Sequence, residues 1–422
     1  MRLLKILVVV LGAAVITCVL LNLRVFNFLF IEDWFEARAV NHMSNFVGRG
    51  PFDPDVKIVL IREKQHEGLA PWGDSDRKHR QFFSQLIRAM TTAQAKVLAF
   101  DVAFDGNSAE FDQEFGKAVA DARASGLTVI VGAERYANGK ITPEIPAAFN
   151  QPKWGLITVG AYQGNEESQG PIRAIKLAEM DVANGSALVP SLPLRIVMDS
   201  QAFEPELQEE WNRLLLYSDH AKQKLSETIP LERGKYLFID QASPSDLNSA
   251  TVDAQRIFED FNNPDVLRKN YQNAIVLVGY EMGESKDVLA GGKRLGVQLH
   301  ATAVSNILRQ VFIYRLYLFY SYAIIVVMAL LALLMDTPVG KRLKFTVEVR
   351  IPWTDIKVNV PLGLVIMGGV YLIIAILTFM VWRIYLDVPY HLAALCLSYF
   401  LLWLLFTKLF PPPVEEEDYL RP

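Results

Sequence analysis

The stretch NAIVLVGYEMGESKDVLAG at residues 273–291, with RLGVQLHATAVSNIL following at residues 294–308, combines a strand signal with a helix signal. The apolar run at residues 274–279 predicts a strand, because a short continuous apolar run bounded by turn residues is typical of a buried strand. Residues 298–310 then predict a helix that leads toward a hydrophobic segment. An apolar strand followed by a helix is the repeating unit of an α/β fold.

The chain upstream repeats this alternation. It predicts strands at residues 56–61, 96–102 and 127–132, and helices at residues 76–92 and 109–124. The short connections between them predict parallel pairing through right-handed crossovers. Further predicted elements are strands at residues 156–159 and 236–240 and a helix at residues 190–200. The predicted fold class is an α/β domain with a mostly parallel sheet, joined to α-helical transmembrane spans.

Three other stretches carry a family pattern: KIVLIREKQHEGLAPW at residues 57–72, AKVLAFDVAF at 95–104 and PSLPLRIV at 190–197. Together with residues 273–308 they resemble the CHASE2 extracytoplasmic sensory domain of bacterial membrane receptors. The resemblance implies a sensory role and a last helix that continues into three transmembrane spans. The sequence departs from the family at Arg62, where an acidic residue is usual, at the charged insert 74–78 and at segment 279–285. These departures lie at strand ends, so the resemblance implies no particular ligand.

Four apolar runs, at residues 3–23, 317–335, 362–381 and 391–407, are candidates for membrane spans. A helix needs about 20 apolar residues to cross the roughly 30 Å hydrocarbon layer. The first run continues past Cys18 without a small-x-small cleavage site, which favours an uncleaved signal anchor over a removed signal peptide. One transmembrane helix before the α/β domain and three after it are therefore predicted.

Basic residues in the short connections set the orientation of these spans. Arg2 and Lys5 flank the first span, and the connection at residues 336–359 carries five more basic residues, whereas residues 383–390 contain Arg383 alone. Positive charge collects on the cytoplasmic side of a membrane. Both termini are therefore expected in the cytoplasm of a bacterium, with the α/β domain outside its cytoplasmic (inner) membrane.

The predicted organisation follows from these signals. It comprises a signal anchor at 1–24, the extracytoplasmic domain at 25–314, a transmembrane helix at 315–336, a cytoplasmic basic hairpin at 337–360, a transmembrane helix at 361–382, a short outer loop at 383–390, a transmembrane helix at 391–408 and an acidic cytoplasmic tail at 409–422.

The basic hairpin is predicted because apolar and polar residues alternate on both sides of a turn-prone PWTD at residues 352–355. It either lies on lipid headgroups or docks a cytoplasmic partner. The side chains expected to contact such a partner are Lys341, Arg342, Lys344 and Trp353. We expect no kinase, cyclase or other output domain on this chain, so a separate signalling or envelope protein must read its state. Homo-oligomerisation is a further option.

Candidate ligand-binding residues lie where predicted strands end, because the carboxyl ends of parallel strands form the binding crevice of an open α/β sheet. These strand ends and the adjoining loop carry Glu63, Asp101, Glu134, Asp240, Glu281 and Asp287. The predicted ligand-binding residues are Asp101, Glu63, Asp287 and His300, and Asp101 is the strongest candidate of the four. Two alternatives stay open: Asp101 as a structural cap of the following turn, and His300 as a packing residue.

Several function classes lack their motifs in this sequence. It contains no G-x-G-x-x-G fingerprint at a strand-to-helix turn, no GK[ST] phosphate loop and no G-x-S-x-G elbow. The six histidines show no metal-ligand spacing, the two cysteines lie in apolar runs, and the net charge of −4 gives no nucleic-acid footprint. We therefore expect no catalytic residue, metal, cofactor or nucleic-acid partner. A sensor subunit is the leading hypothesis, ahead of an envelope scaffold and a membrane-bound hydrolase.

Overall fold

The computed structural model divides the chain into two compact units. One, the α/β unit, comprises Val40–Ile313, and the other, the helical unit, comprises Met1–Ala39 together with Tyr314–Pro422. The structure describes residues 2–23, 25, 51–62, 76–104, 109–137, 140–142, 144–157, 174–181, 187–208, 211–219, 221–231, 236–240, 242–281, 287–289, 292–336, 346–350 and 357–405.

A six-stranded sheet forms the centre of the α/β unit, and every strand pair in it is parallel. Its order is β14 (Thr251–Asp253), β1 (Val56–Arg62), β15 (Ile275–Glu281), β2 (Val97–Ala103), β3 (Thr128–Ala133) and β6 (Lys153–Leu156). The predicted apolar strand of the 273–291 stretch is thus β15, which lies between β1 and β2. The predicted α/β class with parallel pairing is confirmed.

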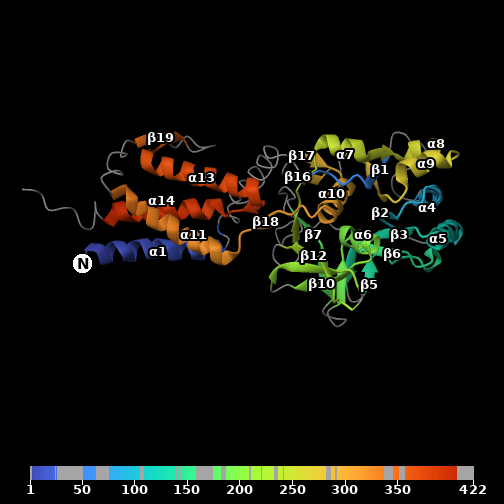
Figure 1. Cartoon of the computed structure of the whole chain (residues 1–422), viewed down its shortest axis with the longest axis horizontal. Helices are drawn as coiled ribbons and strands as arrows, with labels where there is room; N and C mark the ends of the chain where they lie inside the picture. Colours follow the sequence, from blue (N-terminus) through green and yellow to red (C-terminus); the bar gives the residue numbers. More distant parts are fainter. Residues whose placement is uncertain are drawn as a thin grey trace, which may run out of the picture. The chain divides into compact units, whose positions relative to one another are not determined.

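Helices cover both faces of this sheet (Figure 1). Successive strand residues point to opposite faces, so Leu98 and Phe100 of β2 pack in one core and Val97 and Ala99 in the other. The first core is covered by α4 (Asp76–Thr92), α5 (Ala109–Ala124), α8 (Ala254–Glu259) and α9 (Pro264–Tyr271). The second core is covered by α6 (Leu192–Gln201), α7 (Pro244–Ala250) and α10 (Gly296–Leu308).

Two predicted strands differ from expectation. The strand expected at 156–159 is β6, which ends at Leu156, and β13 (Tyr236–Phe238) is not part of the parallel sheet. Instead β13 pairs antiparallel with β7 (Ala174–Lys176). Leu237 of β13 is fully buried in the small accessory sheet, as a residue of the main sheet would be. The apolar content of a strand therefore does not tell which of the two sheets it joins.

Short antiparallel pairs complete the unit. They comprise β4 (Arg135–Ala137) with β5 (Lys140–Thr142), β8 (Ala178–Asp181) with β9 (Ala187–Pro190), β16 (Asp287–Leu289) with β17 (Gly292–Arg294), and the three-stranded sheet of β10 (Glu204–Gln208), β11 (Arg213–Tyr217) and β12 (Leu225–Pro230). A short 3-10 helix, η2 (Ala147–Phe149), precedes β6.

The helical unit contains α1 (Arg2–Asn22), α11 (Leu318–Leu331), α13 (Leu362–Trp382) and α14 (Val388–Leu404) around a shared apolar core (Figure 1). Among the described helices, α13 alone is long and apolar enough to cross a membrane. Apolar helices of 10–17 residues lie at Ile6–Asn22, Leu318–Leu334 and Val388–Leu404. The 3-10 helix η5 (Ala332–Asp336) continues α11.

Two strand pairs accompany these helices. The predicted hairpin is present as β19 (Thr346–Arg350) paired antiparallel with β20 (Lys357–Pro361). The four partner-contact candidates of this region, Lys341, Arg342, Lys344 and Trp353, lie outside the described residues. The second pair, β18 (Tyr314–Arg315) with β21 (Ile384–Tyr385), is parallel.

Candidate functional site

Asp101 lies near the carboxyl end of β2 on the face that α6 and α10 cover. It follows Val97 and Ala99 at intervals of two residues, so its side chain points to the same face as theirs. Its side chain is 13% exposed, so it combines contact with the interior and access to solvent. Asp101 was predicted to lie at a strand end, and the structure places it there, on the face of the sheet that α6 and α10 cover.

His300 of α10 contacts Asp101. Its side chain is 1% exposed, and Nε2 lies 3.4 Å from Oδ1 of Asp101 and 3.2 Å from the carbonyl oxygen of Ile157. A carbonyl oxygen can only accept, so Nε2 carries the hydrogen in that contact. Nδ1 is buried and has no hydrogen-bond partner in the part of the chain that the structure describes. The contact joins the end of β2 to the middle of α10.

The backbone of β6 brings the Ile157 carbonyl into this position. The N–H of Ile157 donates to the carbonyl of Ala133 over 2.9 Å, which extends the β3–β6 ladder beyond Leu156. Gly132 lies beneath this point, and a Cβ there would approach Cγ2 of Ile157 to 2.6 Å and the Val102 carbonyl to 2.7 Å. A residue without a side chain is therefore required for β2, β3 and the Ile157 segment to meet closely.

A glycine also lets the start of α10 pack closely against β15. A Cβ on Gly279 would lie 2.6 Å from Cβ of Val297, so only glycine lets the helix approach this strand. The N–H of Leu295 donates to Oε1 of Gln298 over 3.2 Å, which satisfies a backbone donor at the helix start. These two features fix where α10 begins and so place His300 over the end of β2.

A second polar cluster lies at the carboxyl ends of β1, β14 and β15. Nε of Arg62 lies 2.9 Å from Oε2 of Glu281 and 3.7 Å from Oδ2 of Asp253. Asp253 also accepts from the N–H of Gln255 at the start of α8. The departure at Arg62 is thus matched by an acidic neighbour, because Arg62 and Glu281 are register partners on adjacent strands. By the two-residue period, Arg62, Glu281 and Asp101 point to the same face.

The other predicted site residues that the structure describes lie on or after other elements. Glu63 lies outside the described residues, and Asp287 is in β16, opposite Arg294 of β17. Glu134 follows β3, is exposed, and its N–H donates to the carbonyl of Thr142. Asp240 follows β13, so the strand that it follows does not belong to the parallel sheet. Of the predicted ligand site, the structure brings together Asp101 and His300.

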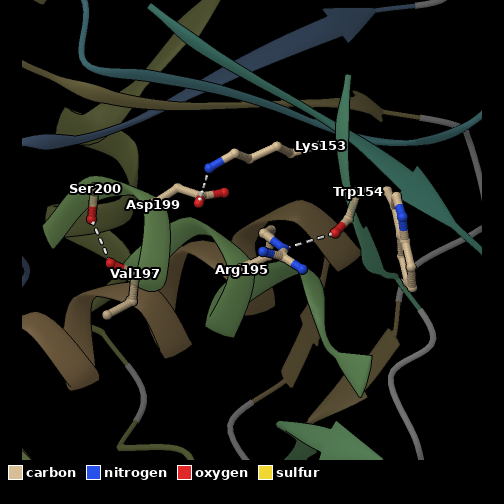
Figure 2. A network of polar contacts seen from close by, with 6 residues as sticks. All are labelled: Lys153, Trp154, Arg195, Val197, Asp199 and Ser200. Atoms are coloured by element: carbon tan, nitrogen blue, oxygen red, sulfur yellow. Dashed lines mark hydrogen bonds and ion pairs between the residues drawn. The ribbon is translucent and has the colours of Figure 1, made fainter. Parts of the chain in front are cut away.

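Polar contacts between α6 and β6 cover the outer edge of the sheet. Figure 2 shows Asp199 of α6 paired with Lys153 of β6 and Nε of Arg195 donating to the Trp154 carbonyl over 3.1 Å. Burial lowers the pKa of Arg195 from its ordinary value and outweighs the opposing effects of Asp199 and Glu204. Capping an edge carbonyl in this way protects a strand from pairing with another chain. This network supports the fold rather than the Asp101 site.

Sequence reasoning did not identify the Ile157 carbonyl or Asp253. A main-chain carbonyl carries no side-chain signal, and the role of Asp253 depends on the position of β14 at the sheet edge. The helix predicted at residues 190–200 is α6, but Pro190 ends β9 and the helix begins at Leu192, with Ser191 as the N-cap and Pro193 in the first turn. Among the described residues, no group of three His, Cys, Asp or Glu side chains could hold a metal ion.

The arrangement can act as a switch in hydrogen bonding. A partly exposed carboxylate contacts a buried imidazole, so a group that binds the carboxylate from outside would change the environment of His300 and α10.

Comparison with known proteins gives one match. The model of the CHASE2 domain family matches residues 10–335, which is more than half of the chain. No curated protein and no solved structure matches the chain.

Proposed function

Because this chain belongs to the CHASE2 family of sensory domains found in bacterial signalling proteins, we propose that it is the membrane-bound receiver subunit of a signalling system. Its α/β unit would bind an external cue at the carboxyl end of β2. A separate protein in the membrane or cytoplasm would read the resulting state. The proposal assigns no catalytic role to the chain.

The proposed topology has four membrane spans, formed by α1, α11 with η5, α13 and α14. Large apolar side chains are exposed along these helices, including Val8, Phe319, Ile373 and Trp403. An extended apolar surface of this kind is unusual on a soluble protein and suits contact with lipid. With both termini in the cytoplasm, as the basic residues favour, the α/β unit lies outside the membrane.

The observation that carries the proposal is the contact between Asp101 and His300. Asp101 is partly exposed near the carboxyl end of β2, and His300 belongs to α10, the last helix before the chain enters the helical unit at Tyr314. A cue that binds the Asp101 carboxylate would compete with His300 for it. Such a cue would favour one position of α10 over another, which is the differential affinity that a two-state receiver requires.

The chemistry of Asp101 limits the class of cue. A partly exposed carboxylate takes hydrogen-bond donors or positively charged groups from outside, and Arg62, on the same face of the sheet, is paired with Glu281 and Asp253. We therefore propose a cue that carries a positively charged amine. Amino sugars and peptidoglycan fragments have this chemistry.

The proposal is tested by ligand-dependent thermal unfolding of the full-length chain in lipid nanodiscs, against metabolites, amino sugars and peptidoglycan fragments. A true ligand at about 100 times its Kd stabilises the folded state by about 2.7 kcal/mol. We expect this stabilisation to be lost in Asp101→Asn. It should be retained in Glu114→Gln, which makes the same chemical change on α5, across the sheet.

Two results would count against the proposal. One is a melting temperature that no compound raises, and the other is stabilisation that survives in Asp101→Asn. If a stoichiometric partner then co-purified equally well with wild type, Asp101→Asn and His300→Gln, the scaffold hypothesis would replace sensing.

A further inference from the structure

The first residues of the helical unit after the α/β unit, β18, form a strand pair with β21 in the connection between α13 and α14. β18 pairs with β21 in parallel, with Tyr314 opposite Ile384 and Arg315 opposite Tyr385. The N–H of Tyr314 donates to the carbonyl of Arg383 over 2.9 Å, and the N–H of Leu316 donates to that of Tyr385 over 3.1 Å. Both strands lead directly into helices, so the pair holds the first residues of α11 beside those of α14.

A buried side-chain bond continues this pairing into the helices. Oγ of Ser321, near the start of α11, donates to Oδ2 of Asp387 over 2.6 Å. Asp387 occupies the N-cap position of α14, and both side chains are buried. Ile325, Leu386 and Val388 belong to the same apolar core, and Tyr371 and His391 lie within electrostatic range of the Asp387 carboxylate. A carboxylate in such surroundings is costly unless it is hydrogen-bonded, so the bond resists separation of the two helices.

The same face of α14 also contacts α13. His391, one turn after Asp387, is buried, and its Nδ1 is hydrogen-bonded to the hydroxyl of Tyr371. Most other contacts in this core are between apolar side chains, which permit small displacements of one helix along another. Hydrogen bonds fix one alignment, because a shift of either helix separates donor from acceptor.

We propose that Ser321 and Asp387, together with the β18–β21 pair, form a clamp that makes α11 and α14 move as one body. A displacement at the entry to the helical unit would then reach α14 directly, rather than α11 alone. The clamp lies wholly within the helical unit and needs no ligand. It therefore stands even if the α/β unit proves not to bind a cue.

The clamp is tested by pulsed electron paramagnetic resonance on the full-length chain in lipid nanodiscs. Cys18→Ala and Cys396→Ala remove the native thiols, and spin labels are placed on cysteines at Val327 of α11 and Phe400 of α14. These positions are 53% and 52% exposed, so the labels do not enter the core. We expect a single narrow distance distribution in this background.

Removal of either side chain of the bond should broaden the distribution. Ser321→Ala and Asp387→Ala are each expected to add a second population of distances. Asp387→Asn should keep the narrow distribution, because the amide oxygen still accepts from Ser321. The matched control is Thr378→Val, which removes a hydroxyl whose bond, among the described residues, stays within α13 and goes to the carbonyl of Ile374.

The double variant separates a clamp from two independent effects. Ser321→Ala with Asp387→Ala should broaden the distribution no more than Asp387→Ala alone, because both changes break one bond. The proposal is overturned if the distance distribution of Ser321→Ala is as narrow as that of Thr378→Val. It is also overturned if the distribution of the double variant is broader than that of Asp387→Ala. Should Asp387→Ala fail to fold, Ser321→Ala and Asp387→Asn decide the question between them.

Discussion

Replacing Asp112 with alanine is expected to destabilise the α/β unit by about 3 to 5 kcal/mol, because it removes the counter-ion of a buried guanidinium. Arg80 of α4 and Asp112 of α5 form an ion pair whose side chains are only 2% and 4% exposed. The guanidinium also lies 5.3 Å from the ring centre of Phe149 in η2. Without Asp112, the buried guanidinium loses this charged partner while it remains beside a core rich in phenylalanine rings.

The chain offers a matched control on the same two helices. Arg88 of α4 and Glu114 of α5 form an ion pair at 3.1 Å, but their side chains are 42% and 29% exposed and so reach solvent. Exposed pairs contribute about 0 to 1 kcal/mol, so Glu114→Ala should have little effect. Thermal unfolding of the full-length chain would show a melting temperature lower by roughly 10 °C for Asp112→Ala. Equal shifts in the two variants would contradict the structural role of the buried pair.

A second large effect is expected at Glu227, whose replacement by glutamine should stabilise the protein at alkaline pH. Glu227 lies on β12 on the same face as Ile229, is 8% exposed, and burial raises the pKa of its carboxyl group from 4.5 to about 7. The unfolded chain ionises at the lower value. The stability that this group contributes is therefore complete below about pH 4.5 and is lost as the pH rises through about 7.

The measurement is the difference in unfolding free energy between Glu227→Gln and wild type from pH 4.5 to 8.5. The rise from 4.5 to about 7 corresponds to about 3.5 kcal/mol at about 1.4 kcal/mol per pKa unit, so the glutamine variant should be more stable by roughly 3 kcal/mol above pH 7.5, and the difference should vanish toward pH 4.5. Glu206 of β10 is the control, because its hydrogen bond to Gln208 lowers the pKa of its carboxyl group. Glu206→Gln should not stabilise the protein at alkaline pH, and a flat difference for Glu227→Gln would refute the prediction.

The central fold could be predicted because strand and helix signals follow each other closely along the chain. The apolar run at residues 274–279 became β15, and the predicted helix at 298–310 overlaps α10. The same logic failed for β13, which is equally apolar but joins β7 in an accessory sheet. Which strands pair is decided by tertiary contacts, so sequence periodicity cannot supply it.

The sequence allowed the residues of the candidate site to be chosen, but not the contacts between them. Asp101 and His300 were each chosen for their place beside a strand end or a helix start, and either could have been purely structural. Their contact depends on Gly279 letting α10 approach β15 and on the Ile157 carbonyl extending past β6. The pairing of Arg62 with Glu281 depends likewise on the register of two strands far apart in sequence.

The proposed coupling of Asp101 to α10 is tested most directly by hydrogen–deuterium exchange of α10 in the full-length chain in nanodiscs. In Asp101→Ala, His300 loses one of its two contacts, so the amides of α10 from Gln298 to Val304 should exchange faster than in wild type. Exchange in α4, which lies on the opposite face of the sheet, should stay unchanged. Identical exchange of α10 in Asp101→Ala and wild type would contradict the proposed coupling.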